Sequence, residues 1–260
     1  RSSAASDVYK RQGDACTTTS VALASAWPAT DDVILVEADP GGGDLAAWLD
    51  LPVTPSLSTV VTRVIDGAWP DVERLTRLDD SGLRLIPAPA RIAEAGQAVG
   101  EASRVLVPTL ASLDSPVTIA DTGRLTAATT SHPFVAAASV TVLVHRQATQ
   151  SSRAAAVRLQ RLVEQVEALQ SSPSTLVVAV VGAAPFGVGE IESFLADHAG
   201  STSVVGLPVD ELAAAVFGGR TGVSERRLAR LPLVRASRDL ALAVQRSLAR
   251  TGGELWRSPR

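Results

Sequence analysis

The sequence has 260 residues, of which 46% are apolar and 20% are charged, a composition that suits a globular domain with a sizeable core. Its net charge of −3 argues against a broad nucleic-acid-binding face, and its single cysteine, Cys16, excludes an internal disulfide framework and a multi-cysteine zinc site. No stretch approaches the roughly 18 uninterrupted apolar residues of a membrane-spanning helix, and no secretory leader is recognisable, so we expect a cytoplasmic protein.

Residues 1–12 differ in composition from the rest of the chain. They contain the only lysine, Lys10, and they resemble the in-frame translation of a common transposon sequencing adapter, while the whole sequence contains no methionine. We therefore expect this segment not to be native and to stand where the first strand of the sheet belongs. The domain itself is expected over residues 13–250, followed by a short tail over 251–260.

Short β-branched runs alternate with longer helical patterns in the remaining chain. Such alternation is typical of repeated βαβ units, and the near-continuous apolarity of the strands indicates burial on both faces. The sequence therefore predicts an α/β fold with a doubly wound, mostly parallel sheet flanked by helices. The predicted strands are 33–36, 83–86, 117–120, 140–144, 176–181 and 203–206, and the predicted helices are 17–26, 93–113, 150–169, 189–198, 211–217 and 235–250.

The first predicted helix follows a turn of small residues and carries hydroxyl groups in its first turn. Residues 13–20 read Gly-Asp-Ala-Cys-Thr-Thr-Thr-Ser. Free backbone N–H groups and the helix dipole favour phosphate at such an N-terminus, and a threonine hydroxyl there can ligate Mg²⁺. The alternative interpretation is a threonine-capped helix after an ordinary loop.

Two of the predicted strands end in carboxylates. Glu37 and Asp39 follow the strand at 33–36, and Asp121 follows the strand at 117–120. Ligands of open α/β sheets bind at the carboxyl ends of the strands, where one aspartate can hold Mg²⁺ through water and another can orient an attacking water. Taken singly, each of these acids could equally be only a turn former.

In this order and spacing the segments resemble the ParA/MinD branch of the P-loop ATPases, and more narrowly MinD/ParA-like proteins of actinobacteria. The resemblance covers nearly all of residues 13–248. The phosphate loop of the family, Lys-Gly-Gly-x-Gly-Lys-Thr-Thr, overlays residues 13–18, with Thr17 at the Mg²⁺ ligand and Cys16 at the P-loop lysine. The resemblance thus implies nucleotide contacts from Gly13, Ala15, Cys16, Thr17 and Thr18.

The same resemblance implies roles for acids at the strand ends. Asp39 matches the second aspartate of the family's Asp-x-Asp-Pro segment, which implies a catalytic role, and Glu37 replaces the first. Asp121 matches the Mg²⁺-linked aspartate of the switch loop. Pro208 and Asp210 match the Pro-x-Asp loop that lies against the nucleotide base.

Two departures from the family pattern bear on activity. Cys16 cannot supply the positive charge that the family's lysine gives to the transferring phosphate, and no lysine follows it in the chain. Gly182 stands where relatives often place the asparagine that reads adenine. We therefore expect nucleotide binding and, at most, weak ATP hydrolysis.

The resemblance implies a switch that binds ATP and Mg²⁺, forms a homodimer with nucleotide, and positions cargo such as chromosomal or plasmid DNA or a membrane-associated machine. Contact with DNA or a membrane is expected to be indirect, through a protein partner. One alternative is a non-catalytic pseudo-ATPase scaffold, which the cysteine in the phosphate loop favours. Another is a metabolic relative, such as an amide-forming or carboxylating ligase. The terminal helix, 235–250, could reach a membrane, but we expect it to dock on its own sheet.

Overall fold

The computed structural model describes residues 15–28, 32–67, 77–78, 83–111, 117–125, 129–148 and 151–255. Within these ranges the strands form two sheets, with the orders β2-β3-β1-β4 and β5-β6-β7. All neighbouring strands are parallel except β2 and β3, which are antiparallel. The strands are β1 (Val33–Glu37), β2 (Arg77–Leu78), β3 (Arg84–Ile86), β4 (Val117–Asp121), β5 (Val140–Arg146), β6 (Thr175–Val181) and β7 (Ser203–Leu207).

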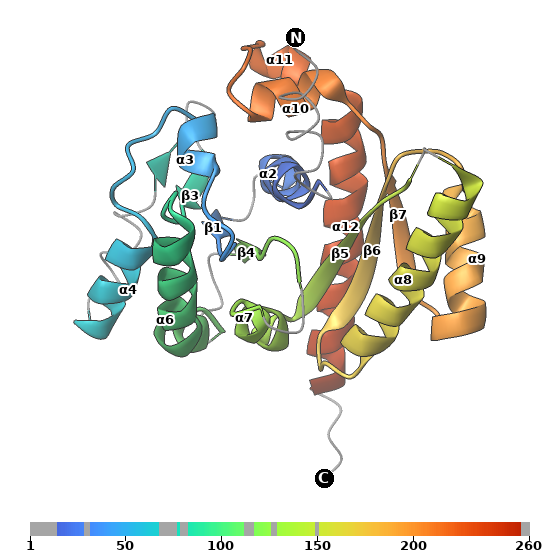
Figure 1. The fold of residues 1–260 in the computed structure, drawn as a ribbon, viewed down its shortest axis with the longest axis horizontal. Helices are drawn as coiled ribbons and strands as arrows, with labels where there is room; N and C mark the ends of the chain where they lie inside the picture. Colours follow the sequence, from blue (N-terminus) through green and yellow to red (C-terminus); the bar gives the residue numbers. More distant parts are fainter. Residues whose placement is uncertain are drawn as a thin grey trace.

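Helices cover both faces of the two sheets (Figure 1). On one side α2 packs against α12, and this pair contacts strands of both sheets. The opposite side is covered by α4, α6 and α7 over the first sheet and by α8 and α9 over the second. The helices are α2 (Cys16–Ala26), α3 (Leu45–Trp48), α4 (Leu57–Ile65), α6 (Ile92–Ala111), α7 (His132–Ala137), α8 (Ser152–Gln170), α9 (Val188–Ala199), α10 (Glu211–Phe217), α11 (Glu225–Leu228) and α12 (Pro232–Leu255).

The burial of alternate strand residues explains this layering. In β1, Leu35 packs into the core beneath α2 and α12, whereas Ile34 and Val36 pack into the core beneath α4 and α6. In β6, Val177 faces the α2 and α12 side, whereas Val178 packs beneath α8 and α9. Successive side chains of a strand point to opposite faces, so apolar runs of this kind require helices on both sides. The predicted α/β class with parallel strands is confirmed.

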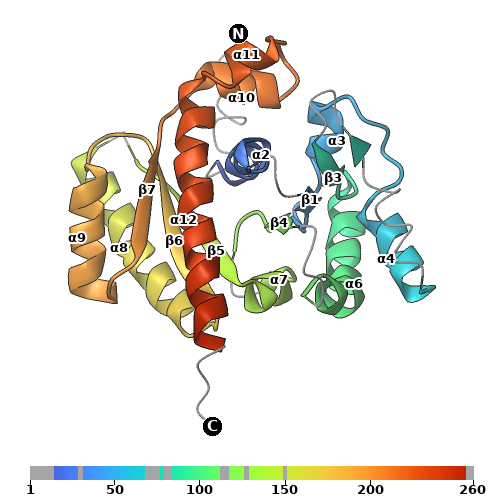
Figure 2. The same cartoon turned by 180° about the vertical axis from the view of Figure 1, so that it is seen from behind.

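The expected single sheet is divided between β4 and β5. Among the described residues no strand pairs with both of these strands. One hydrophobic core, built on α2 and α12, nevertheless contains strand residues of both sheets. Figure 2 shows these two helices with β7 on one side and β1 on the other. The expectation that residues 1–12 stand in place of a first strand falls outside the described ranges.

The predicted long elements are present with shifts of a few residues at their ends. The helix expected at 93–113 is described as Ile92–Ala111, and the terminal helix runs from Pro232 to Leu255, beyond both expected ends. Several short elements were not predicted: α3, α4, α7, α11 and β2. Except for α4 they have six residues or fewer, too few for a hydrophobic period to be recognised.

The terminal helix α12 docks on the body of the protein, as expected. Leu240 and Val244 are buried, while Arg235 and Arg246 are exposed on the opposite side of the helix. Among the described residues, no helix combines the length and apolarity needed to cross a membrane.

Candidate functional site

The N-terminus of α2 opens from a left-handed turn. Ala15 has φ 67° and ψ 19°, and its carbonyl oxygen accepts the backbone N–H of Thr19 at 2.9 Å. Ala15 is the N-cap residue, and its side chain cannot accept a hydrogen bond from the first turn; that turn also carries no acidic residue. The first N–H groups of a helix have no partner within the helix, so this end favours an anion.

The alternative of a threonine-capped helix is wrong, because Thr17 and Thr18 lie inside the first turn and not at the N-cap. Both side chains are half-buried. Gly13, the first residue of the expected phosphate loop, lies outside the described residues.

Cys16, Asp39 and Asp121 meet beside this helix end. The Cys16 thiol donates a hydrogen bond to Asp121 Oδ1 at 3.2 Å, and the Gly123 N–H donates to the same oxygen at 3.1 Å. Asp39 lies against Gly123, where a Cβ atom would overlap the Asp39 carboxyl group. Gly123 also has φ +61°, a left-handed conformation that glycine adopts without strain. The predicted clustering of the strand-end acids around the helix N-terminus is therefore present.

Asp121 is buried at 1% exposure, and its Oδ2 has no hydrogen-bond partner among the described residues. A buried carboxylate oxygen without a partner is costly in a folded protein, and a cation or its bound water is a common remedy. The oxygen ligands offered by Asp121 and by the first turn of α2, a carboxylate and threonine hydroxyls, suit Mg²⁺.

A cage made only of protein ligands is not formed, because no group of three or more His, Cys, Asp or Glu side chains in the described ranges is arranged to hold a metal ion. Mg²⁺ usually binds through one or two protein oxygens, together with waters and substrate phosphates. The arrangement therefore fits a magnesium ion that arrives with a phosphorylated ligand.

The site accumulates negative charge. Burial, followed by the charge of Asp121, raises the pKa of the Cys16 thiol well above its ordinary value. Burial also raises the pKa of Asp39, and the charges of Asp121 and Asp44 add to this effect, while the Gly41 N–H opposes it. The ion pair of Arg91 with Glu94 lies on exposed side chains at the start of α6 and does not involve these acids. A positively charged ligand would relieve this repulsion.

Glu37, at the end of β1, is 2% exposed, and its carboxylate accepts three backbone N–H groups. Burial raises its pKa to about 7, although these three N–H donors act in the opposite direction. Its pairing partner across β1 and β4 is Asp121. The sequence identified Glu37 only as a replacement for an aspartate, since its backbone partners lie as far away as Ala88.

The residues expected beside the nucleotide base lie at the end of β7. Asp210 uses both carboxylate oxygens within the chain: Oδ1 accepts the Ala213 N–H at 2.9 Å, and Oδ2 accepts the Leu233 N–H at 3.2 Å. It therefore caps the N-termini of α10 and α12. Pro208 precedes the exposed Val209, and Gly182 lies next to Val209, so the expected base-side segments are adjacent. A nucleotide contact from Pro208 or Asp210 stays a prediction.

Gln147 is a residue of this region that sequence reasoning missed. Its amide group donates to the carbonyl oxygens of Gly182 and Phe186 and accepts the Phe186 N–H, at 2.7, 2.8 and 3.0 Å. Gln147 is buried at the end of β5, and it holds the loop after β6 in place. Nothing in the local sequence marks this role, because the partners are more than thirty residues away.

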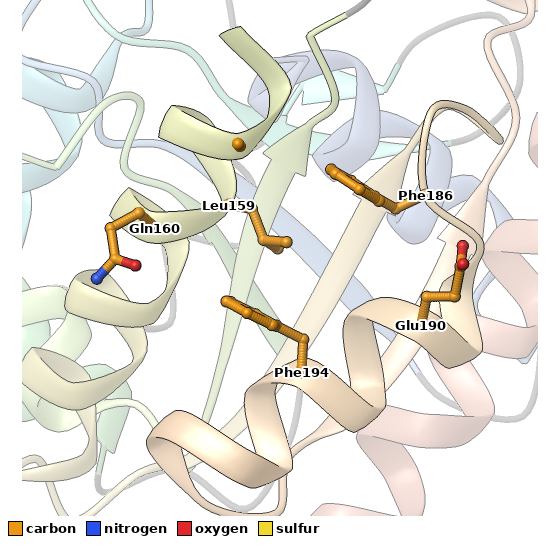
Figure 3. Close-up of a pocket in the computed structure, with 6 residues that line it drawn as sticks. Leu159, Gln160, Phe186, Glu190 and Phe194 are labelled. Atoms are coloured by element: carbon orange, nitrogen blue, oxygen red, sulfur yellow. The ribbon is translucent and has the colours of Figure 1, made fainter. Parts of the chain in front are cut away.

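A cavity of about 410 Å³ lies elsewhere, between α8 and α9 (Figure 3). In the close-up Leu159, Phe186 and Phe194 surround it, with Gln160 and Glu190 at its sides. Its lining is mostly apolar and contains none of the strand-end acids. The chemistry of the candidate site therefore does not involve this cavity.

Comparisons with known proteins agree with this architecture. No protein-family model and no curated protein matches the sequence. Among solved structures, MinD of Pyrococcus horikoshii OT3 in complex with Mg-ADP is 13% identical, with a TM-score of 0.65 over 90% of this chain and 92% of its own. A ParA-family ATPase of Chlorobium tepidum TLS is 16% identical, with a TM-score of 0.64 over 88% and 93%.

An enzyme with another activity is similar as well. Cobyrinic acid a,c-diamide synthase of Mycobacterium smegmatis, solved with an ATP analogue and magnesium, is 20% identical, with a TM-score of 0.53 over 91% of each chain. Similarity at this level of identity establishes the fold and leaves the function open. This chain has helices on both faces of parallel strands, and the N-terminus of α2 lies beside the ends of β1 and β4. It therefore has the fold of the ParA/MinD-type P-loop ATPases.

Proposed function

We propose that this protein is a nucleotide switch of the ParA/MinD type that binds ATP with Mg²⁺ at the N-terminus of α2. The observation that carries this proposal is the meeting of Cys16, Asp39 and Asp121 at that helix end, with a buried Asp121 oxygen that has no partner among the described residues. The nucleotides and magnesium in the similar MinD and cobyrinic acid a,c-diamide synthase structures support the choice of ligand.

Each residue of the site has a distinct task in this proposal. The N–H groups of the first turn of α2 bind phosphate oxygens, and the turn at Ala15 directs the chain around them. The Thr17 hydroxyl and Asp121 would hold Mg²⁺, Thr17 as a direct ligand and Asp121 through water, and Thr18 would contact phosphate. Asp39 orients a water for attack on the terminal phosphate. Mg²⁺, when bound, neutralises charge that develops on the phosphate oxygens.

Cys16 makes hydrolysis slow. A neutral thiol that donates to Asp121 offers no positive charge to the phosphate that is transferred. This observation also favours the second candidate function, a pseudo-ATPase scaffold that binds nucleotide without turnover. Measurement of steady-state ATP hydrolysis separates the two candidates. If the protein hydrolyses ATP and Asp39→Ala abolishes this activity, the scaffold is excluded.

The deciding experiment is equilibrium binding of ATP and GTP, with Mg²⁺ and with EDTA. We expect Mg²⁺-dependent binding that Thr17→Ala weakens at least about tenfold, since a lost metal ligand costs this much or more. Thr62→Ala is the matched control, because Thr62 is an exposed helical threonine of α4 whose hydroxyl donates to the Ser58 carbonyl oxygen within the same helix. Equal loss in both variants, or no binding of either nucleotide, rejects the proposal.

Cys16→Lys provides a gain-of-function test. A lysine here adds the missing cation next to Asp121 and the phosphates, so we expect tighter ATP binding and faster hydrolysis. Measured turnover that stays at the wild-type level would show that the cysteine is not what limits hydrolysis.

Homodimerisation and cargo positioning form the finer part of the proposal. We expect a monomer without nucleotide and a dimer with Mg-ATP in sedimentation velocity, with Thr17→Ala monomeric in both conditions. The cargo, whether DNA or a membrane-associated machine, is reached through a protein partner.

A further inference from the structure

Glu37 connects two loops that follow different strands. Its Oε1 accepts the backbone N–H groups of Asp44 and Leu45 at 2.8 and 3.1 Å, at the end of the loop after β1. Its Oε2 accepts the N–H of Ala88 at 2.9 Å, in the loop after β3. One buried carboxylate thus holds both loops.

The two loops also touch each other around this carboxylate. The Gly43 N–H donates to the Pro89 carbonyl oxygen at 2.9 Å. A Cβ atom at Gly43 would lie 2.7 Å from Glu37 Oε2 and would overlap the Ala88 carbonyl oxygen. Only a residue without a side chain permits this approach. The contact between the two loops therefore depends on both glycine at position 43 and the carboxylate at position 37.

The loop held in this way carries Asp39. At its beginning, the Ala38 N–H donates to the Asp121 carbonyl oxygen at 2.7 Å, and at its end Glu37 binds Asp44 and Leu45. Between these two anchors Asp39 accepts the Gly41 N–H at 2.7 Å and lies against Gly123. If Glu37 is removed, this end of the loop loses its hydrogen bonds at Asp44 and Leu45 and keeps the one from Gly43 to Pro89.

We propose that Glu37 is a positioning residue that fixes Asp39 at the candidate site by clamping the loop after β1 onto the loop after β3. The clamp is a property of the chain alone, but its consequence for catalysis rests on the proposed function of Asp39. Glu37 itself is too deeply buried to touch a ligand, at 2% exposure.

The first test is amide hydrogen exchange in Glu37→Gln, which keeps the size of the side chain but turns an N–H₂ group toward backbone N–H donors. Because the glutamine oxygen can still accept on one side, we expect at least tenfold faster exchange at Ala88, or at Asp44 and Leu45, and a shifted amide resonance of Gly41. Amides of the α8 and α9 core, such as Leu162 and Ile191, are expected to remain unchanged. Unchanged exchange at Asp44, Leu45 and Ala88 overturns the clamp.

Glu190→Gln is the matched control, because Glu190 also accepts a backbone N–H with its carboxylate, from Gly187 at 2.6 Å, but in α9. It should alter the Gly187 amide and leave Gly41 unchanged. Gly43→Ala tests the clamp from the other side if Glu37→Gln fails to fold, since its Cβ atom forces the two loops apart. We expect the same amides to respond; if they do not, the clamp is overturned.

The catalytic consequence is tested by separating affinity from turnover. We expect Glu37→Gln to change the dissociation constant of Mg-ATP by less than about twofold, because α2 holds the phosphates, and to lower kcat at least tenfold. Glu37→Asp, which restores the carboxylate, should recover part of the lost turnover. Faster exchange at Ala88, or at Asp44 and Leu45, with unchanged kcat overturns the positioning role. If the wild-type protein does not hydrolyse ATP, the catalytic part of the proposed function fails, and the exchange data still decide the clamp.

Discussion

Residues of this site are buried next to negative charge, and the reactivity of the Cys16 thiol is the simplest way to measure this environment. Cys16 is the only cysteine, so every thiol signal comes from it. Its raised pKa leaves little thiolate near neutral pH, and the thiolate is the reactive form. We expect iodoacetamide to alkylate Cys16 at least about tenfold more slowly than a free cysteine at pH 8.

Asp121→Asn removes the negative charge that disfavours the thiolate of Cys16, and so should accelerate alkylation. Asp197→Asn, an exposed change in α9, is the control and should leave the rate unchanged. A wild-type rate equal to that of free cysteine would contradict the described environment of the thiol.

Glu37 makes the stability of the protein depend on pH. Its pKa is about 7 in the folded protein, whereas an ordinary glutamate, as in the unfolded chain, has a pKa of 4.5. The folded state therefore binds the proton more tightly than the unfolded state. The contribution of Glu37 to the free energy of unfolding is fully present below pH 4.5 and is lost as the pH rises to about 7. The difference in unfolding free energy between wild type and Glu37→Gln should therefore fall by about 3 kcal/mol across this range.

Urea denaturation of both proteins between pH 4.5 and 7.5 measures this difference, and Glu190→Gln serves as the control with no such trend. A difference that is constant with pH would mean that the three N–H donors outweigh burial and keep the carboxylate ionised.

Whole elements are set in place by residues that act at their ends. Asp210 caps α10 and α12 with its two oxygens, and α12 contributes a large part of the core that joins the sheets. We expect Asp210→Ala to destabilise the protein by about 2 kcal/mol, since each lost cap costs about 1 kcal/mol. Asp210→Asn keeps one acceptor and should cost about half as much. Denaturant unfolding measures both.

The same variants test whether Asp210 also contacts nucleotide. If the variants bind nucleotide more weakly but are as stable as the wild type, Asp210 contacts the nucleotide and does not stabilise the helices. Unchanged affinity with lower stability is the result that its two helix caps favour.

The long elements follow from their sequences, but their ends and the short elements do not. The strand β1 and the helix α2 are where the apolar run and the small-residue turn predict them. The left-handed turn at Ala15, and its place as N-cap, are not evident from local sequence, because alanine seldom adopts positive φ. Ala15 contacts the cluster beneath α2, which is formed by residues distant in sequence.

At the scale of the whole molecule, the core beneath α2 and α12 unites two sheets that share no hydrogen bonds in the described strands. Leu240 of α12 is fully buried in this core. We expect Leu240→Ala to cost about 3 kcal/mol through lost burial and a residual cavity. Hydrogen exchange should accelerate in both sheets, for example at Val36 and Val180, because the core is shared.

Leu242→Ala is the matched control, on the same helix but 49% exposed, and should cost less than about 0.5 kcal/mol. If Leu240→Ala accelerates exchange in one sheet only, the two sheets unfold separately, and α12 does not couple them.

The amino-acid sequence by itself determined the α/β class, the order of the long strands and helices, and the presence of acids at the strand ends beside a helix N-terminus. These features are encoded locally, in apolar runs and in residues next to one another. Only the tertiary structure decided that Cys16 donates to Asp121, that Asp39 packs on Gly123 and that Glu37 binds Ala88. Those contacts join residues 51 to 105 positions apart, or depend on how closely two loops approach, so no local pattern predicts them.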